Sequence, residues 1–482
     1  MKKKLKFLAL LLLLSLVLET GVASAGTVPY DTYNYDYWEN IVLTPAAYIP
    51  AGSISGSTVG TTGFMNPQDI SVGDDGRIYV ADSGNNRIVV IAADHKSLDR
   101  VIEGVMIDGK LSKFNGPYGI YVTKENLIYI ADTNNRRIVV LDDEDNLVDI
   151  IENPQSEVLA KDYAFMPLKV CVDYAGRVYS IIKGETLGIM QFEGHEFTGY
   201  FGTIEVGISL AEKFWRKIAT KEEREKQIQY VPTEFTGLDI DEDGFIFATN
   251  RDTQGKQAVR RLNPKGDDVI RKGENQNVGG DIITSGTSDY SGASYIVDVA
   301  VRDKGIYSLL DNKRGRIFTY DSEGNLLYIF GGLGTQTGTF VTPVSIEADN
   351  RFIYVLDSFR KEILLFKVTE YGALINEAVG LRYDGDEKEA VDIWWKVLAL
   401  DENNELANRG IGKAYLSAGD NEMAMKYLEL GNSRQYYSIA FKRYRNELLK
   451  ASLGYILTVL FVIIVGLVAF KQYKKRSVKK KG

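Results

Sequence analysis

The chain has 482 residues, with 57 Lys and Arg, 65 Asp and Glu, and a net charge of −8. Its 45% apolar and 25% charged residues are ordinary for a globular protein, which excludes wholesale disorder, collagen-like repetition and a multi-span membrane protein. One Cys and two His exclude a disulfide framework and any site that needs three imidazoles.

The N-terminal segment 1–25 has the pattern of a secretory signal peptide. Four lysines among its first six residues precede an apolar run from Phe7 to Leu18, and Ala23-Ser24-Ala25 supplies an A-x-A cleavage site. The apolar run has about 12 residues, whereas a membrane span needs ~20. We therefore expect cleavage after Ala25 and export of the chain that follows.

From residue 64 onward the sequence repeats, and its first two units are offset by 50 residues. Each unit contains period-2 apolar runs separated by turns rich in Gly and Asp, which predict three or four short strands. Fainter copies of the second strand near residues 178, 245, 306 and 353 bring the number of units to six. Six small sheets bury both of their faces by stacking radially, so the pattern predicts a mainly β fold, a six-bladed β-propeller over 46–368. We expect Tyr48–Ile54 to close the ring as the outer strand of the last unit.

These repeats resemble the NHL repeat, most closely in Ala-Asp-Ser-Gly-Asn-Asn-Arg-Ile at 81–88 and in its copy at 131–138. The resemblance covers about 46–368 and implies an NHL-type propeller similar to the membrane-tethered ones of Gram-positive bacteria. The pairs Asp82/Arg87 and Asp132/Arg137 are expected to brace the blades, because a guanidinium fits a carboxylate bidentately.

Residues 207–229 interrupt the repeat with a helical insertion. Apolar residues at 208, 210, 214, 215 and 218 form a helical stripe, and Thr220-Lys221-Glu222-Glu223 is typical of a capping box. The insertion either caps one face of the ring or docks a partner, in which case Phe214 and Trp215 are the contact candidates.

After the propeller, Gly385-Asp386-x3-Ala390 recurs as Gly419-Asp420-x3-Ala424, an offset of 34 residues. This spacing resembles about two tetratricopeptide (TPR) units over 373–432. Because about three such units are needed for a continuous core, we expect these helices to lean on the propeller or on the following helix. Trp394 is expected either to pack inside this region or to line a peptide groove.

A basic helix over 433–450 is expected to lead into a transmembrane helix over 451–470, which carries no charge. The tail 471–482 holds seven basic and no acidic residues, which predicts that it is cytoplasmic. We therefore expect a single-pass type I protein of the cell membrane with its propeller outside. The segment 26–470 has 46 basic and 64 acidic residues, which argues against nucleic-acid binding.

Two sets of residues are candidates for ligand binding. Alignment of the six innermost strands places polar residues or glycines at equivalent positions facing the channel: Asp69, Gly119, Lys169, Gly237, Asp298 and Ser345. Asp69 and Asp298 are candidate ligands of a divalent cation, and Lys169 and Ser345 are candidates for a polar ligand, with a solvated channel as the alternative. In the aromatic-rich segment 26–45, Tyr35 and Trp38 either stack on a sugar or pack along the propeller wall.

The sequence contains no G-x-S-x-G, P-loop, H-E-x-x-H or EF-hand pattern, so we assign no catalytic residue and expect no cofactor. We expect a non-enzymatic, membrane-anchored extracellular binding or scaffold protein. Its partner would be a protein, such as a component of a transport system, or a glycan. The alternative is a metal-assisted lactonase-like or lyase-like enzyme that uses a divalent cation at the channel.

Overall fold

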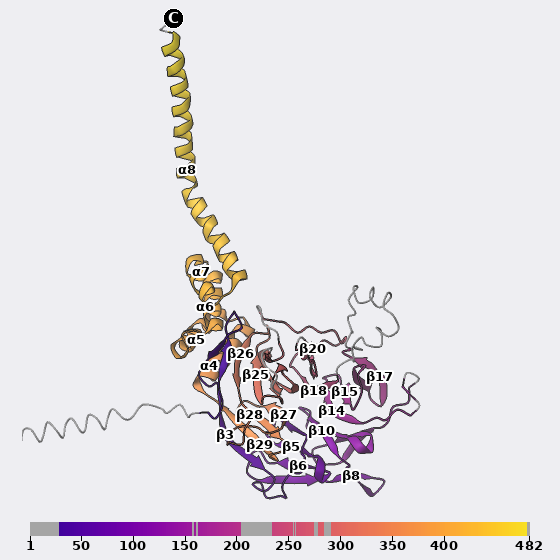
Figure 1. Ribbon diagram of the computed structural model, residues 1–482. Helices are drawn as coiled ribbons and strands as arrows, with labels where there is room; N and C mark the ends of the chain where they lie inside the picture. Colours follow the sequence, from indigo (N-terminus) through magenta and orange to yellow (C-terminus); the bar gives the residue numbers. More distant parts are fainter. Residues whose placement is uncertain are drawn as a thin grey trace, which may run out of the picture.

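A computed structural model shows a ring of blades, a helical region beside it and one long helix that projects away (Figure 1). It describes residues 28–479 except 157–158, 161, 204–233, 254, 256, 274–277 and 284–290. The expected signal segment 1–25 and the expected helical insertion 207–229, with Phe214 and Trp215, lie outside the described residues.

Six antiparallel sheets form the propeller, which confirms the predicted fold. Blades 1 to 3 are β4 (Asp69–Val72), β5 (Ile78–Asp82), β6 (Arg87–Ile91) and β7 (Leu98–Ile102); β10 (Pro117–Val122), β11 (Ile128–Asp132), β12 (Arg137–Leu141) and β13 (Leu147–Ile151); and β14 (Pro167–Val172), β15 (Val178–Ile182), β16 (Ile189–Glu193) and β17 (Glu196–Phe201). Blades 4 to 6 contain β18 (Phe235–Ile240), β19 (Ile246–Asn250) and β20 (Val259–Leu262); β23 (Ile296–Val301), β24 (Tyr307–Asp311), β25 (Arg316–Tyr320) and β26 (Leu326–Phe330); and β27 (Pro343–Ala348), β28 (Phe352–Asp357) and β29 (Glu362–Val368). Two hairpins stand apart, β8 (Gly104–Ile107) with β9 (Lys110–Lys113) and β21 (Ile282–Ile283) with β22 (Gly292–Ala293).

The first strand of each blade lies at the centre of the ring. These six strands contact one another in the order β4, β10, β14, β18, β23, β27 and back to β4. The second and third strands of blades 1 and 2 are buried at every position, because a neighbouring blade covers each of their faces. The apolar cores therefore lie between blades, and polar residues of the first strands face the axis.

The ring closes through the N-terminal strand β3 (Tyr48–Ser55). This strand pairs with β29 of blade 6 from Tyr48↔Val368 to Ser55↔Glu362. The predicted closure is confirmed, and backbone hydrogen bonds join the first and last parts of the propeller. Two further strands, β1 (Tyr33–Tyr35) and β2 (Ile41–Leu43), extend the outer edge of blade 5 beyond β26.

The repeated Asp–Arg pairs brace blades 1 and 2 as expected. The Arg87 Nε donates to Asp82 Oδ2 at 2.7 Å, and the other oxygen of Asp82 accepts from the Met65 backbone at 2.7 Å. Arg137 and Asp132 repeat the contact at 2.8 Å. Each buried aspartate thus ties its own strand to the loop that enters the blade.

Four helices follow the propeller: α4 (Glu370–Asp384), α5 (Glu387–Leu400), α6 (Glu405–Ala418) and α7 (Asn421–Leu430). The Thr369 hydroxyl caps α4 and the Asn404 side chain caps α6, while Gly385 and Gly419 end these two helices in the left-handed conformation. Consecutive helices pack together as pairs in the region of the expected TPR-like units. The TPR assignment itself stays a prediction.

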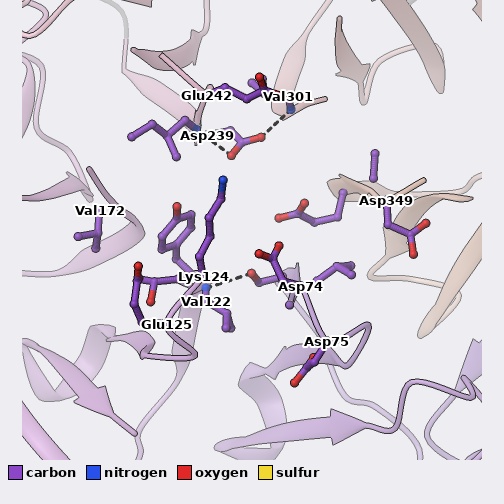
Figure 2. Close-up of a pocket in the computed structure, with 18 of the residues that line it drawn as sticks. Asp74, Asp75, Val122, Lys124, Glu125, Val172, Asp239, Glu242, Val301 and Asp349 are labelled. Atoms are coloured by element: carbon purple, nitrogen blue, oxygen red, sulfur yellow. Dashed lines mark hydrogen bonds between the residues drawn. The ribbon is translucent and has the colours of Figure 1, made fainter. Parts of the chain in front are cut away.

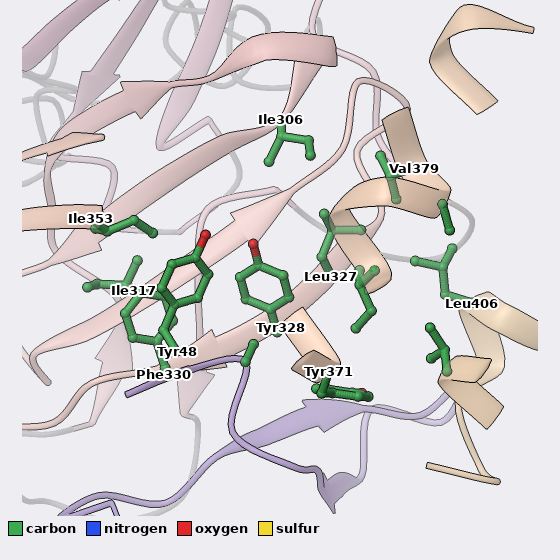
Figure 3. Close-up of a cluster of buried hydrophobic side chains, with 14 of the residues drawn as sticks. Tyr48, Ile306, Ile317, Leu327, Tyr328, Phe330, Ile353, Tyr371, Val379 and Leu406 are labelled. Carbon is green, nitrogen blue, oxygen red and sulfur yellow. The ribbon is translucent and has the colours of Figure 1, made fainter. Parts of the chain in front are cut away.

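The helical region and the propeller share one hydrophobic core. Figure 3 shows Tyr48 of β3, Tyr328 of β26 and Tyr371 of α4 in the same buried cluster. Polar contacts surround it: Arg382 of α4 pairs with Glu323 of blade 5 at 2.7 Å, and the Tyr328 hydroxyl donates to Asn376 at 2.8 Å. The helices therefore lean on blades 5 and 6.

The last element, α8 (Arg434–Lys479), is one helix of 46 residues. Separate helices are predicted over 433–450 and 451–470, whereas the structure continues one helix through both ranges and into the basic tail. Its stretch Arg434–Tyr473 is long and apolar enough to cross a membrane, and the apolar part makes no buried contact with the rest of the molecule. Figure 1 shows it leaving the helical region without a break.

Candidate functional site

Four residues predicted to face the channel meet in one buried network. The Lys169 ammonium lies 2.5 Å from Asp69 Oδ1 and 3.2 Å from Asp298 Oδ2. The Ser345 hydroxyl donates to Asp69 Oδ1 at 2.8 Å. Because none of the four is more than 6% exposed, they pair with one another rather than face an open solvated channel.

The two aspartates also join neighbouring blades. Asp69 Oδ2 accepts from the backbone of Ile120 on β10, and Asp298 Oδ2 accepts from that of Ile346 on β27, both at 3.0 Å. The remaining aligned positions are glycines because the strands approach closely there. A Cβ at Gly119 would lie 2.3 Å from the Leu168 carbonyl, and one at Gly237 would lie 2.5 Å from Asp298 Oδ1.

The charges in the network stabilise one another. Burial alone would lower the pKa of Lys169, but Asp298 and Asp69 raise it above its ordinary value. Burial raises the pKa of Asp298 to about 6, against the opposing effect of Lys169. At neutral pH the network therefore contains a charged ammonium held by carboxylates.

This arrangement bears on the candidate cation ligands Asp69 and Asp298. The Lys169 ammonium lies between them, where a divalent cation shared by the two carboxylates would have to lie. Across the part of the chain that the structure describes, no three His, Cys, Asp or Glu side chains are grouped so that they could hold a metal ion. A metal at this position would have to displace a protein cation.

A cavity of about 1090 Å³ lies where the innermost strands end, and all six blades line it. Figure 2 shows Asp74, Glu125, Asp239 and Asp349 around it. Among the described residues, ten carboxylates and three cationic side chains, Lys124, Arg302 and Arg351, line this space. The cavity therefore has a strongly negative surface inside low-dielectric walls.

Two of these carboxylates, Asp239 and Glu347, lie one step along the channel from the Lys169 network. Asp239 accepts from its neighbour Ile240 at 2.8 Å and from Val301 of the next blade at 2.6 Å. Burial is the main cause that raises the pKa of Asp239 to about 7 and that of Glu347 well above its ordinary value, with neighbouring carboxylates adding to both. Neither residue is among the predicted site residues, although each is two positions after an aligned channel residue and so faces the same side of its strand.

The other predicted residues lie away from this cavity. The hydroxyls of Tyr33 and Tyr35 each donate to Asp281 at 2.7 Å, so Tyr35 packs against the propeller. Trp38 is 66% exposed, beside the Arg434 guanidinium at the start of α8. Trp394 is buried among the helices, where its indole nitrogen would lie 2.4 Å from a Cβ at Gly410.

Comparison with known proteins supports the repeat assignment. Residues 64–91 and 114–141 match the NHL repeat model, so the first two units are NHL repeats. No curated protein matches the sequence.

Solved structures of similar fold include three with low sequence identity. Virginiamycin B lyase from Staphylococcus aureus is 13% identical, with a TM-score of 0.39 over 63% of this chain and 95% of its own. A Kuenenia stuttgartiensis hydrazine synthase is 12% identical, with a TM-score of 0.40 over 73% and 99%. A Bacteroides thetaiotaomicron protein of unknown function is 16% identical, with a TM-score of 0.44 over 69% and 80%. Likenesses this distant transfer no activity to the chain.

Proposed function

We propose that the protein is a membrane-anchored binding or scaffold protein that presents its propeller and helices outside the cell to a protein or glycan partner. A component of a transport system is one such partner. The observation that carries the proposal is the cavity of about 1090 Å³, which is lined by all six blades and large enough for a side chain or a sugar.

The connection to α8 supports an anchoring role. The core shared by blades 5 and 6 and the helices fixes the helical region on the propeller. Arg409 of α6 adds a buried hydrogen bond to Asn325 of blade 5 at 3.2 Å. Since α8 runs unbroken from Arg434, the cavity would be held at a fixed place relative to a span within that helix.

The lining of the cavity narrows the class of partner. Carboxylates accept hydrogen bonds from hydroxyl, amide and ammonium groups, all of which occur on glycans and proteins. The same carboxylates repel phosphate, which disfavours nucleic acid. In a type I orientation, the cavity would meet partners at the outer surface of the membrane.

Crosslinking of the full chain in native membranes tests the proposal. Ala93 lies exposed at the cavity, so Ala93→Trp narrows the entrance, whereas Ala51 is exposed on β3 and does not line it. We expect the wild type and Ala51→Trp to crosslink to the same partner and Ala93→Trp to lose it. Recovery of no partner by the wild type, or the same yield from both variants, would contradict a binding role for the cavity.

The enzymatic alternative is favoured by one feature, the pKa of Asp239 near 7, which suits a general acid or base. A metal-assisted lactonase-like or lyase-like reaction would also need a divalent cation at the channel. Because the Lys169 ammonium contacts both candidate cation ligands, Asp69 and Asp298, binding of a divalent cation there is disfavoured. The binding role has no such requirement.

A further inference from the structure

We propose that the cavity is a site for a primary ammonium group, which would lie between Asp239 and Glu347. The source would be a lysine side chain of a partner or a small free amine, and both offer the same chemistry. The inference rests on the proposed binding function and specifies its ligand.

The first support is the charge balance of the cavity. Of its three cationic side chains, Arg351 pairs with Asp349 at 2.9 Å, and Arg302 donates to the hydroxyls of Tyr48 and Tyr328 at 2.7 and 2.9 Å. Lys124 lines the cavity with its ammonium 5.7 Å from the centre of the Tyr174 ring. Four of the ten carboxylates pair with arginines: Asp75, Asp173, Asp241 and Asp349. Among the described residues the other six make no ion pair, so the lining keeps a net negative charge that attracts a cationic ligand.

The second support is Glu347 itself. Within the described residues, its carboxylate takes part in no hydrogen bond and no ion pair, although it is partly buried on β27 and lines the cavity. Asp239 uses its oxygens for backbone amides of Ile240 and Val301, and it too has no cationic partner in the part of the chain that the structure describes. Both carboxylates are only partly exposed, and partial burial without a counter-charge disfavours the ionised form. Uptake of a proton or binding of a cation therefore stabilises each of them.

The third support is an ammonium that the channel already binds. Lys169, which is 6% exposed, places its Nζ between Asp69 and Asp298 at 2.5 and 3.2 Å. The next layer of side chains lies two residues further along each innermost strand: Ser71, Tyr121, Cys171, Asp239, Ala300 and Glu347. This layer again has two carboxylates but contains no lysine. A ligand ammonium between Asp239 and Glu347 would therefore repeat the contact that the Lys169 ammonium makes with Asp69 and Asp298 in the adjacent layer.

Binding of an ammonium should depend on pH, because Asp239 and Glu347 must first lose their protons. The groups that face them from the surrounding elements are Asp69 of β4, Tyr121 of β10, Lys169 and Cys171 of β14, Asp241 just after β18, and Asp298 of β23. The three aspartates raise the pKa of the pair, Tyr121 and Cys171 are neutral below pH 8, and Lys169 lowers the pKa of Glu347. Affinity should therefore rise as the pH rises from 5 to 8.

Calorimetric titration of the detergent-solubilised full chain tests the site with two probes, a pentalysine peptide and cadaverine. The wild type should bind at least one probe, about tenfold more tightly at pH 8 than at pH 5. Glu347→Gln removes a carboxylate that makes no internal contact and should weaken binding by about tenfold or more. Glu103→Gln removes an exposed carboxylate outside the cavity and should leave binding unchanged.

The two probes separate the sources of the ammonium: binding of cadaverine indicates a small amine, and binding of pentalysine alone indicates a lysine-bearing partner. Thermal unfolding should show Glu347→Gln to be no less stable than the wild type. Binding of neither probe, or equal binding by wild type and Glu347→Gln, would overturn the inference. If the native partner still crosslinks to Glu347→Gln but not to Ala93→Trp, the ammonium site is wrong and the proposed binding function stands. If the protein binds an amine but no partner is recovered from membranes, the ammonium site stands and the proposed binding function is wrong.

Discussion

At the scale of single residues, the buried network in the channel depends on the Lys169 ammonium. This ammonium is the only cationic group in contact with Asp69 and Asp298 among the described residues, and all three side chains are at least nine-tenths buried. A buried ion network of this kind adds little net stability over an apolar core, but removal of one member leaves charges without a partner. The residue is therefore a sensitive point for mutation.

Replacing Lys169 by Met should destabilise the protein by ~3–5 kcal/mol at pH 7, because two buried aspartates lose their counter-charge. Below pH 6 the loss should shrink, since Asp298 then takes up a proton. Denaturant unfolding in detergent at pH 7.5 and pH 5 measures both effects. Lys113→Met, which breaks an exposed pair with Glu103, should change stability by about 0–1 kcal/mol. Equal losses in the two variants would mean that the network is not buried as described.

The wild type should also lose stability as the pH rises from about 4 to about 7. Asp298 and Asp239 have folded-state pKa values of about 6 and about 7, above the ordinary carboxyl value. Between these limits the folded state binds more protons than the unfolded state, so a rise in pH favours unfolding, by ~1.4 kcal/mol per unit of pKa difference.

Asp239→Asn isolates the contribution of one carboxyl group, because it removes the raised pKa of Asp239 and leaves those of Asp298 and Glu347 in place. Denaturation midpoints at pH 4.5, 6 and 7.5 should fall less steeply in the variant than in the wild type. Identical slopes would show that Asp239 titrates as an ordinary exposed carboxyl.

Added Ca²⁺ should leave the melting temperature of the wild type unchanged at about 1 mM. The Lys169 ammonium lies between Asp69 and Asp298, and a hard cation wants six or more oxygen ligands. Differential scanning fluorimetry with and without a chelator measures the effect. A saturable rise in melting temperature would instead favour the metal-assisted enzyme.

Whether a site residue could be predicted depends on how far along the sequence its contacts in space lie. The six aligned channel positions follow from the repeat alone, because equivalent positions in a repeat face the same way. The pairing of Lys169 with Asp69 and Asp298 joins blade 3 to blades 1 and 5, at separations of 100 and 129 residues, and no local pattern records it. The period-2 rule would have added Asp239 and Glu347 had it been carried one step further along each strand.

At the scale of elements, ring closure depends on β3. Ile54 of β3 is 4% exposed and packs between blades 6 and 1, whereas Ile41 of β2 is 63% exposed at the edge of blade 5. Ile54→Ala should destabilise by ~2–4 kcal/mol, and Ile41→Ala by about 0.5 kcal/mol or less. Thermal unfolding of the two variants makes the comparison. If both behave like the wild type, the ring does not depend on this strand for stability.

The strands that the sequence analysis missed are short and lack a clear alternation. β1 and β2 have three residues each, and they are held by Tyr33 and Tyr35 through hydrogen bonds to Asp281, more than 240 residues away. The long helix α8 was expected as two parts because its composition changes near residue 450. A change from polar to apolar composition does not by itself end a helix, and Arg434–Lys479 contains no Pro to break it.

At the scale of the whole molecule, the orientation of α8 in the membrane decides on which side the propeller and its cavity lie, because the propeller is fixed to this one continuous helix. The tail 471–482 carries seven basic residues, so the positive-inside rule predicts a cytoplasmic tail and an external propeller. Cys171 is fully buried, so single cysteines introduced elsewhere report their own exposure. A membrane-impermeant maleimide should label Ser97→Cys on blade 1 in intact cells, and Ser477→Cys in the tail only after permeabilisation. N-terminal sequencing of the same protein should begin at Gly26. Labelling of the tail in intact cells would reverse the orientation, and the cavity would then face the cytoplasm, where an external partner could not reach it.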